Sequence, residues 1–356
     1  MLELGELFQA ADRWLVELGK SLGVPPILIE LLATILAATV IVALIAVLVL
    51  VFVYAERKIS AHMQNRMGPM RVGWHGILQT LADGLKMLQK EDIMPAAADR
   101  WIWWWAPGLA FIAVFAAFVT IPFGKGLHVE DLNIGVLYIM AITTFGVIAM
   151  LMAGWGSNNK YSLLGGFRSA AQVVSYEVPF VLAVLSVVMV AGSLSMVNIV
   201  EAQAGYYLGV LPKWFIFRHF PFGLIGFAVF VIAGTAETNR TPFDLPEAES
   251  ELVAGFATEY SGMKYALFYL AEYGAMYVMA AMGTVLFLGG WHGPLLPSWI
   301  WFAIKSLALI FVLMWFRWTF PRLRVDQLME LSWKFLIPLA FLNLLAVGLW
   351  SVLSHG

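Results

Sequence analysis

Acidic side chains within apolar stretches are the residues of this sequence most able to do chemistry. Glu177 lies in the first half of the stretch 169–190, and Glu272 lies in the first half of the stretch 265–289. A charge at the centre of a membrane helix costs about 2.5–3.5 kcal/mol even on the most lenient insertion scale, and such residues usually mark a path for protons or ions. We therefore expect these two carboxylates to bind and release protons.

A second acidic group follows another apolar stretch. Residues 237–264 hold six carboxylates against two basic side chains, and apolar residues are interspersed among them. Partial burial is therefore expected, and clustered carboxylates in a low dielectric cannot all ionise at neutral pH. Such a group takes up and releases protons when a nearby charge changes. The spacing of Asp244 and Glu247 also fits a helix capping box, which would leave the other acids on a solvated face.

Missing residue types exclude several other chemistries. The chain has no cysteine, so it cannot ligate an iron–sulfur cluster through thiolates, attach a c-type haem or form a disulfide. Its six histidines fall in or near loops or termini, and neither a P-loop nor a dinucleotide fingerprint is present. The formal net charge of -2, with basic residues scattered among loops, argues against nucleic acid as a partner. We expect no redox centre and no metal site.

The elements that hold these acids must lie in lipid. Of 356 residues, 61% are hydrophobic and 12% are charged, whereas a soluble domain has about 45–50% and about 25%. Some apolar stretches reach the roughly 20 residues that a helix needs to cross the hydrocarbon. These stretches are 27–54, 101–122, 134–153, 169–190, 220–236, 265–289, 299–316 and 335–353. The predicted fold is an all-α polytopic membrane protein with about eight transmembrane helices. It forms a single membrane domain, 27–356, after an N-terminal segment, 1–26, without a secretory signal.

The basic residues predict how the chain is oriented. An even number of crossings leaves both termini on one side, and cytoplasmic loops carry an excess of Lys and Arg. One set of loops holds 15 of the 21 basic residues. We therefore predict that these loops are cytoplasmic and that both termini lie outside the cytoplasm. The predicted cytoplasmic loops are 55–100, 154–168, 237–264 and 317–334.

The first of these loops contains an amphipathic pattern that begins at Trp74. Apolar residues recur on one helical face and polar residues on the other. The apolar face consists of Ile77, Leu78, Leu81, Leu85 and Leu88, and the polar face of Gln79, Asp83, Lys86 and Lys90. Such a helix would lie along the membrane surface with its apolar side in the acyl boundary. It could instead serve only as a surface strut.

Two long segments resemble a known family. Residues 55–58 (AERK), 64–69 (QNRMGP) and 82–86 (ADGLK) resemble the first cytoplasmic loop of the NuoH-type subunit of respiratory complex I. Residues 237–252 look like the quinone-loop signature of the same family, including the complete run TNRTPFDLPEAESE. The resemblance extends from about residue 27 to the end of the chain, while 1–26 and 191–218 carry no matching motif.

The resemblance implies a function. The chain would anchor the hydrophilic arm of the proton-pumping NADH:quinone oxidoreductase in the bacterial inner membrane and form much of the quinone chamber. Its partners would be the quinone-site and terminal iron–sulfur subunits and the neighbouring membrane-arm subunits. NADH, FMN and iron–sulfur clusters would be bound only by partners, with quinone as the substrate, so no isolated catalytic activity is expected of this chain.

The resemblance also assigns candidate residues. Quinone would enter between the first span, the amphipathic helix and the sixth span. The expected quinone chamber and entrance contain Arg57, Asp83, Arg240, Phe243 and Asp244. The expected proton path contains Glu177, Glu237, Glu247, Glu249, Glu251, Glu259 and Glu272. The arginines would hold the loops by charge-assisted hydrogen bonds.

Three other functions remain open from the sequence. Membrane-bound hydrogenases contain related subunits that often lack quinone, although the complete quinone-loop run favours the quinone enzyme. A freestanding proton- or cation-coupled transporter would use Glu177 and Glu272 as a midplane ion site. A purely structural anchor would use the acids only to pair with arginines of a docked subunit.

Overall fold

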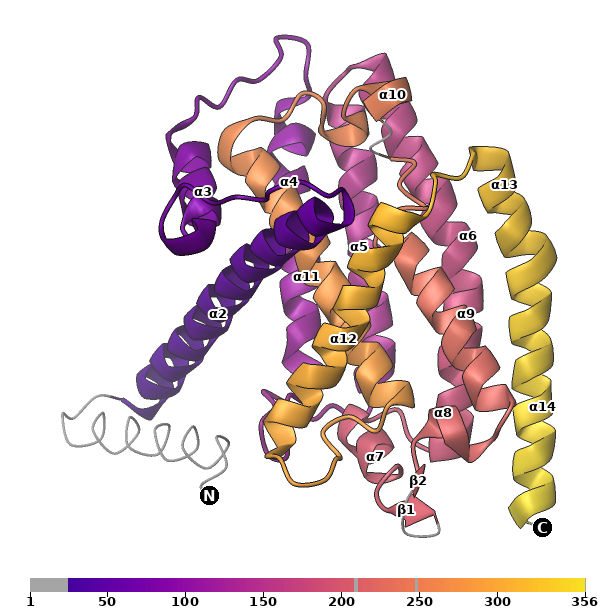
Figure 1. Cartoon of the computed structure of the whole chain (residues 1–356). Helices are drawn as coiled ribbons and strands as arrows, with labels where there is room; N and C mark the ends of the chain where they lie inside the picture. Colours follow the sequence, from indigo (N-terminus) through magenta and orange to yellow (C-terminus); the bar gives the residue numbers. More distant parts are fainter. Residues whose placement is uncertain (1–24, 208–210, 247–248, 356) are drawn as a thin grey trace.

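Long helices make up most of the computed structural model, which describes residues 25–207, 211–246 and 249–355 (Figure 1). The long helices are α2 (Pro26–Met63), α4 (Arg100–Ala117), α5 (Gly135–Gly156), α6 (Lys160–Ala191), α9 (Phe222–Glu237), α11 (Gly262–Phe287), α12 (Ser298–Thr319) and α14 (Ile337–His355). The short helices are α3 (Gln79–Gln89), α7 (Met196–Glu201), α8 (Phe215–Arg218), α10 (Glu249–Leu252) and α13 (Val325–Glu330). Single helical turns are η1 (Trp74–Gly76), η2 (Phe118–Thr120) and η3 (Gly255–Ala257), and η4 (Leu331–Leu336) is a π-helical stretch.

The all-α prediction is confirmed. Within the described residues, β1 (Tyr206–Tyr207) and β2 (Leu211–Pro212) form the only sheet, an antiparallel pair.

All eight predicted apolar stretches are helical. In the described part of the chain, seven helices are long and apolar enough to cross a membrane, and the last of them joins α13, η4 and α14 into one continuous element. The helix α9 is shorter, with 16 residues, and spans about 24 Å at 1.5 Å per residue. It begins after Pro221 and ends where the apolar stretch gives way to the polar residues 237–240.

The predicted cytoplasmic loops lie at one end of the bundle but are shorter than expected. The helix α2 continues to Met63 and α6 begins at Lys160, because residues such as Glu, Arg and Lys are good helix formers that extend a span beyond its apolar part. The elements α3, α10 and α13 gather at this end, and α7, α8 and the β1–β2 pair lie at the other (Figure 1). We call these the inner and outer ends. That the inner end faces the cytoplasm remains a prediction.

The helix α11 forms the centre of the bundle. It packs against α2, α3, α4, α9 and α12, and all residues from 276 to 287 are buried. A helix that is apolar on all sides is expected to be enclosed by protein. Polar side chains on its inner half therefore face neighbouring helices, and this places Glu272 and Tyr273 inside the protein.

The first helix leaves the bundle toward the outer end. Ile45, Val49 and Phe52 are buried on the inner half of α2, whereas Leu32 and Ile35 on the outer half are 61% and 54% exposed. Figure 1 shows α2 tilted away from the other helices. In a bilayer this exposed apolar surface would contact lipid or another subunit.

The predicted amphipathic helix exists but begins later than expected. Trp74 to Gly76 form a single turn in which His75 has a φ of 52°, so the regular helix α3 starts at Gln79. Leu81, Leu85 and Leu88 are 49%, 52% and 63% exposed. The helix packs against α2 and α11, and its apolar face is therefore free to contact the acyl boundary of a membrane.

Candidate proton-relay site

The inner end of α9 turns Arg240 back into the protein. Asn239 adopts a left-handed conformation with a φ of 52°, which commonly ends a helix and which asparagine tolerates. The backbone N–H of Arg240 then donates to the carbonyl of Thr235 at 3.2 Å, and that of Phe243 donates to the carbonyl of Arg240 at 2.8 Å. The side chain of Arg240 is 1% exposed.

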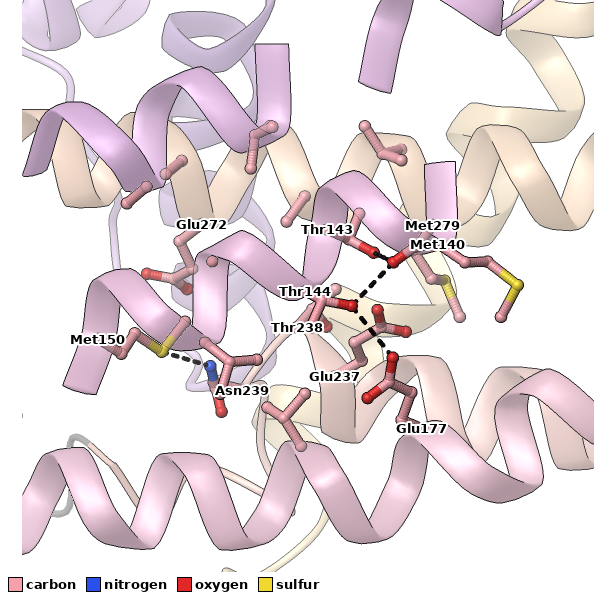
Figure 2. A pocket seen from close by; sticks show the side chains of 18 of the residues that line it. Met140, Thr143, Thr144, Met150, Glu177, Glu237, Thr238, Asn239, Glu272 and Met279 are labelled. Carbon is pink, nitrogen blue, oxygen red and sulfur yellow. Dashed lines mark hydrogen bonds between the residues drawn. The ribbon is translucent and has the colours of Figure 1, made fainter. Parts of the chain in front are cut away.

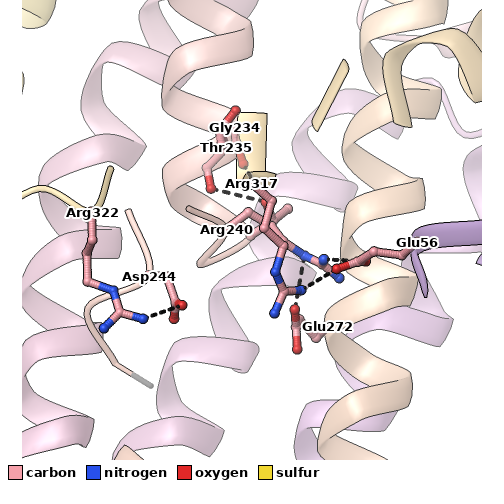
Figure 3. A network of polar contacts seen from close by, with 9 residues as sticks. Glu56, Gly234, Thr235, Arg240, Asp244, Glu272, Arg317 and Arg322 are labelled. Carbon is pink, nitrogen blue, oxygen red and sulfur yellow. Dashed lines mark hydrogen bonds and ion pairs between the residues drawn. The ribbon is translucent and has the colours of Figure 1, made fainter. Parts of the chain in front are cut away.

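Four charged side chains surround this turn, and we call them the arginine cluster: Glu56, Arg240, Glu272 and Arg317. An Nη1 atom of Arg240 lies 2.7 Å from Oε2 of Glu56, and its Nε lies 3.0 Å from Oε1 of Glu272. Arg317 contacts the other oxygen of Glu56 at 2.6 Å. Figure 3 shows Arg240 between the two glutamates. The two positive and two negative charges of the cluster cancel, and pairing of this kind offsets the cost of burying charge.

The environment of Arg240 keeps it charged. Burial by itself would lower the pKa of Arg240, but the carboxylates of Glu272 and Glu56 hold this pKa well above its usual range. The guanidinium also lies 4.4 Å from the ring centre of Tyr273, a cation–π contact. Arg240 thus keeps its positive charge, whereas the neighbouring glutamates can gain or lose a proton.

Phe243 and Asp244 lie on the loop that follows. The Phe243 ring is buried and its centre is 5.2 Å from that of Tyr176 on α6. Asp244 accepts a hydrogen bond from Nη2 of Arg322 at 2.9 Å, beside the arginine cluster in Figure 3. Burial raises the pKa of Asp244, although Arg322, Arg317 and Arg240 act to lower it. The loop is thereby tied to the segment after α12.

Glu177, Glu237 and Glu272 line one cavity of about 100 Å³ between α4, α5, α6, α9 and α11. We call it the carboxylate cavity. Thr144 donates to Oε1 of Glu177 at 3.1 Å, and Figure 2 shows Glu237 beside Glu177, with Glu272 farther along the same space. Since one water needs about 10–15 Å³ of such space, the cavity has room for several waters. Water could bridge carboxylates that do not touch directly.

Glu272 belongs to both groups. Its carboxylate lines the carboxylate cavity and also pairs with Arg240. Two unit charges about 4 Å apart have an interaction energy of about 4 kcal/mol at an effective dielectric constant of 20. A change of charge near Arg240 therefore alters the preferred protonation state of Glu272, and through Glu272 that of the cavity.

The two predicted entrance residues lie apart from this cluster, where α2 meets α3. Arg57 on α2 forms an ion pair with Asp83 on α3, and Gln79 donates to the same carboxylate at 3.2 Å. Both charged side chains are partly exposed. They fix the amphipathic helix to the first span.

The other acids of the predicted path are Glu247, Glu249, Glu251 and Glu259. Glu247 lies outside the described residues, as does the side chain of Glu249 at the start of α10. Glu251 pairs with Arg168 near the surface. Glu259 accepts a hydrogen bond from the side-chain amide of Asn159 at 2.6 Å. Neither Glu251 nor Glu259 lines the carboxylate cavity.

Three residues of the site are absent from the sequence-based candidates: Glu56, Arg317 and Thr144. The apolar run of the first span stops at residue 54, so Glu56 was expected in a loop, whereas α2 carries it inside the protein with 4% exposure. Its partner Arg317 ends another span. A charge within one turn of a span's end is the signal that identifies both, because α-helices extend past their apolar part.

Comparisons with known proteins agree on one family. The model of the NADH dehydrogenase family matches residues 36–348. The chain is 50% identical over 317 residues to the H-type subunit 1 of NADH-quinone oxidoreductase from Geobacter sulfurreducens, covering 83% of this chain and 88% of that protein. It is 48% identical over 340 residues to the H-type subunit from Chlorobaculum tepidum, covering 91% and 94%. It is 51% identical over 300 residues to the H-type subunit from Dehalococcoides mccartyi strain CBDB1, covering 84% and 82%.

Proposed function

The chain belongs to the NADH dehydrogenase family as an H-type subunit of NADH-quinone oxidoreductase, a membrane component of complex I. We propose that it couples quinone reduction to proton translocation. In this proposal the loop that carries Arg240, Phe243 and Asp244 forms one wall of the quinone chamber. The hydrophilic arm of the complex forms the rest. The complex would lie in the bacterial inner membrane, with NADH, FMN and iron–sulfur clusters bound by partner subunits.

Quinone would reach the chamber from the membrane between α2, α3 and α11. The exposed leucines of α3 and the exposed apolar surface of α2 suit an isoprenoid tail. The pair of Arg57 and Asp83 holds α3 against α2 at this entrance. The polar head would then come to the loop after α9, where buried charges are concentrated.

The coupling step uses the shared position of Glu272. Reduction of a quinone to a neutral quinol consumes two electrons and two protons, and an electron that arrives before its proton transiently adds negative charge near the loop. Arg240 stays charged throughout, so the response falls on the carboxylates that pair with it. Glu272 would shift its protonation, and Glu177 and Glu237 would follow as a coupled set. From the carboxylate cavity protons would pass to the membrane arm.

The contact between Arg240 and Glu272 carries this proposal. The acids of the arginine cluster pair with arginines of the same chain, and this favours an internal relay over a purely structural anchor whose acids pair with a docked subunit. Membership in the H-type subunit family argues against a freestanding transporter, which would conduct ions through the purified chain in liposomes without a redox substrate.

The test is replacement of a cavity acid in the assembled complex. Glu177→Gln should keep assembly and much of the NADH:quinone reductase activity but lower the number of protons translocated per electron. Glu330→Gln, at an exposed surface ion pair, is the matched control and should pump normally. A Glu177→Gln complex that assembles and retains full activity and full pumping would remove Glu177 from the path.

A further inference from the structure

Along α6, α9 and α11, an acidic residue and an aromatic residue occur in the same order from the inner end to the outer end. Each carries one acid of the carboxylate cavity: Glu177 near the middle of α6, Glu237 at the inner end of α9 and Glu272 on the inner half of α11. Farther toward the outer end, each contributes an aromatic side chain to one buried layer: Phe180, Phe230 and Phe287. We call this aromatic layer the septum.

The septum is closely packed. The ring centres of Phe180 and Phe230 are 4.8 Å apart, and those of Phe230 and Phe287 are 5.3 Å apart. The three side chains are 3%, 0% and 1% exposed. A methyl group added to Gly283 would come within 2.9 Å of the Phe230 ring, and one added to Gly234 within 2.5 Å of Met279. Space that cannot accept a methyl group cannot accept water.

A small space with a largely apolar lining and a few polar groups lies on the outer side of the septum. This outer pocket has a volume of about 20 Å³ and is lined by Ser186, Phe215, His219 and Phe287, among others. Asn343 of α14 borders the same region, because a methyl group on Gly226 would meet its Nδ2 at 3.1 Å, the hydroxyl of Ser186 at 3.4 Å and the Phe287 ring at 3.5 Å. Its Oδ1 has no hydrogen-bond partner within the described part of the chain. The pocket is large enough for one water.

The carboxylate cavity and the outer pocket are separated by little more than the septum. Phe180 lines the carboxylate cavity and Ser186 lines the outer pocket, and six residues of helix correspond to about 9 Å. Met282 lines the cavity and Phe287 lines the pocket, a separation of about 8 Å along α11. Two or three waters in a row would bridge this distance if the rings were absent.

We propose that the septum of Phe180, Phe230 and Phe287 is a proton barrier, which prevents a continuous water chain between the carboxylate cavity and the outer pocket. Protons bound at the cavity acids then have no direct outward route through this chain and must leave sideways. A dry septum would limit proton leakage between the carboxylate cavity and the outer pocket. The barrier concerns passive leakage and does not depend on the relay proposed above.

The experiment measures proton leak through the purified complex in proteoliposomes without NADH or quinone reduction. A potassium diffusion potential drives proton entry, which a trapped pH dye reports. Phe230→Asn places a hydrogen-bonding side chain in the septum and should raise the leak rate several-fold over the wild-type complex. Phe230→Leu keeps the layer apolar and should stay tight. Phe230→Ala should leak less than Phe230→Asn, because an apolar void remains dry.

The controls separate the septum from a general defect. Phe341→Asn introduces the same group on the exposed side of α14, where the side chain is 51% exposed, and should leave the leak unchanged. If Phe230→Asn does not assemble, Phe180→Asn opens the same layer from α6 and should leak as well. An assembled septum variant as tight as wild type, or equal leakage from Phe341→Asn, would overturn the proposal. Loss of coupled pumping in tight vesicles would instead concern the carboxylate relay.

Discussion

The Nε atom of Arg240 lies 3.0 Å from Oε1 of Glu272, and the same Glu272 lines the cavity that holds Glu177 and Glu237. One carboxylate thus contacts both a fixed buried cation and a space large enough for water. This contact connects the loop at the inner end to acids that lie deeper among the helices. In the proposed relay, coupling between quinone reduction and proton movement would depend on the residues that hold Glu272 in this position.

Replacement of Arg240 by methionine should impair assembly. It leaves the carboxylate of Glu272 buried without its ion-pair partner and removes one of the two arginines beside Glu56. Removing one partner of a buried ion pair typically costs about 3–5 kcal/mol. Native gels and thermal melting of the complex measure the effect. Arg324→Met, which removes an arginine from an exposed pair with Asp326, should leave assembly unchanged. A stable, fully assembled Arg240→Met complex would show that the cluster is not stabilising.

Thr144→Val should weaken coupling more than quinone reduction. The substitution preserves shape but removes the hydroxyl that lies 3.1 Å from Oε1 of Glu177 and 2.9 Å from the carbonyl of Met140, and a typical hydrogen bond contributes about 0.5–1.5 kcal/mol. The ratio of protons translocated to electrons transferred is the measurement. Thr39→Val is the control, since Thr39 bonds only within α2, to the carbonyl of Ile35. An unchanged ratio in Thr144→Val would separate Thr144 from the path.

The stability of the loop after α9 should depend on pH through Asp244. Burial raises the pKa of Asp244 above its ordinary value of 3.8. A raised pKa in the folded state favours the protonated form, so the added stability is complete below the ordinary value and is lost as pH rises through the raised value. The melting temperature of wild type should therefore rise relative to Asp244→Asn as the pH is lowered. Arg322→Met removes a cation that lowers this pKa and should extend the dependence to higher pH. Parallel melting curves for wild type and Asp244→Asn at all pH values would contradict this prediction.

Lys305→Met should destabilise the outer end of the bundle. The Lys305 ammonium donates to the carbonyls of Leu288, Gly290 and His292 at 2.6, 2.9 and 2.6 Å, which lie just after the end of α11. Leaving even one buried acceptor without a donor costs about 1–3 kcal/mol. Thermal melting should show the loss, whereas Lys334→Met, at a side chain that is 73% exposed, should melt like wild type. Equal melting of the two variants would mean that water replaces the ammonium.

The helical architecture follows directly from the sequence because apolar runs of about 20 residues have one stable form in lipid. The same property identifies Glu177 and Glu272, since a charge within such a run needs an explanation. Helix ends were predicted less well. Glu56 was assigned to a loop because the apolar run ends before it, but backbone hydrogen bonds continue α2 to Met63.

Pairing across the bundle could not be predicted from local pattern. Glu56 and Arg317 are 261 residues apart in sequence and 2.6 Å apart in the structure. Hydrophobic periodicity indicates which face of a helix is buried, but it does not say which helix lies opposite. The septum is a similar case, because Phe180, Phe230 and Phe287 appear in sequence as ordinary apolar residues of three separate spans.

The central claim is that quinone reduction changes the protonation of Glu272, and redox-induced infrared difference spectroscopy of the purified complex tests it directly. We predict a carboxyl protonation band in wild type that disappears in Glu272→Gln and persists in Glu259→Gln, whose side chain lies outside the carboxylate cavity. A band of the same position and intensity in Glu272→Gln would contradict this claim.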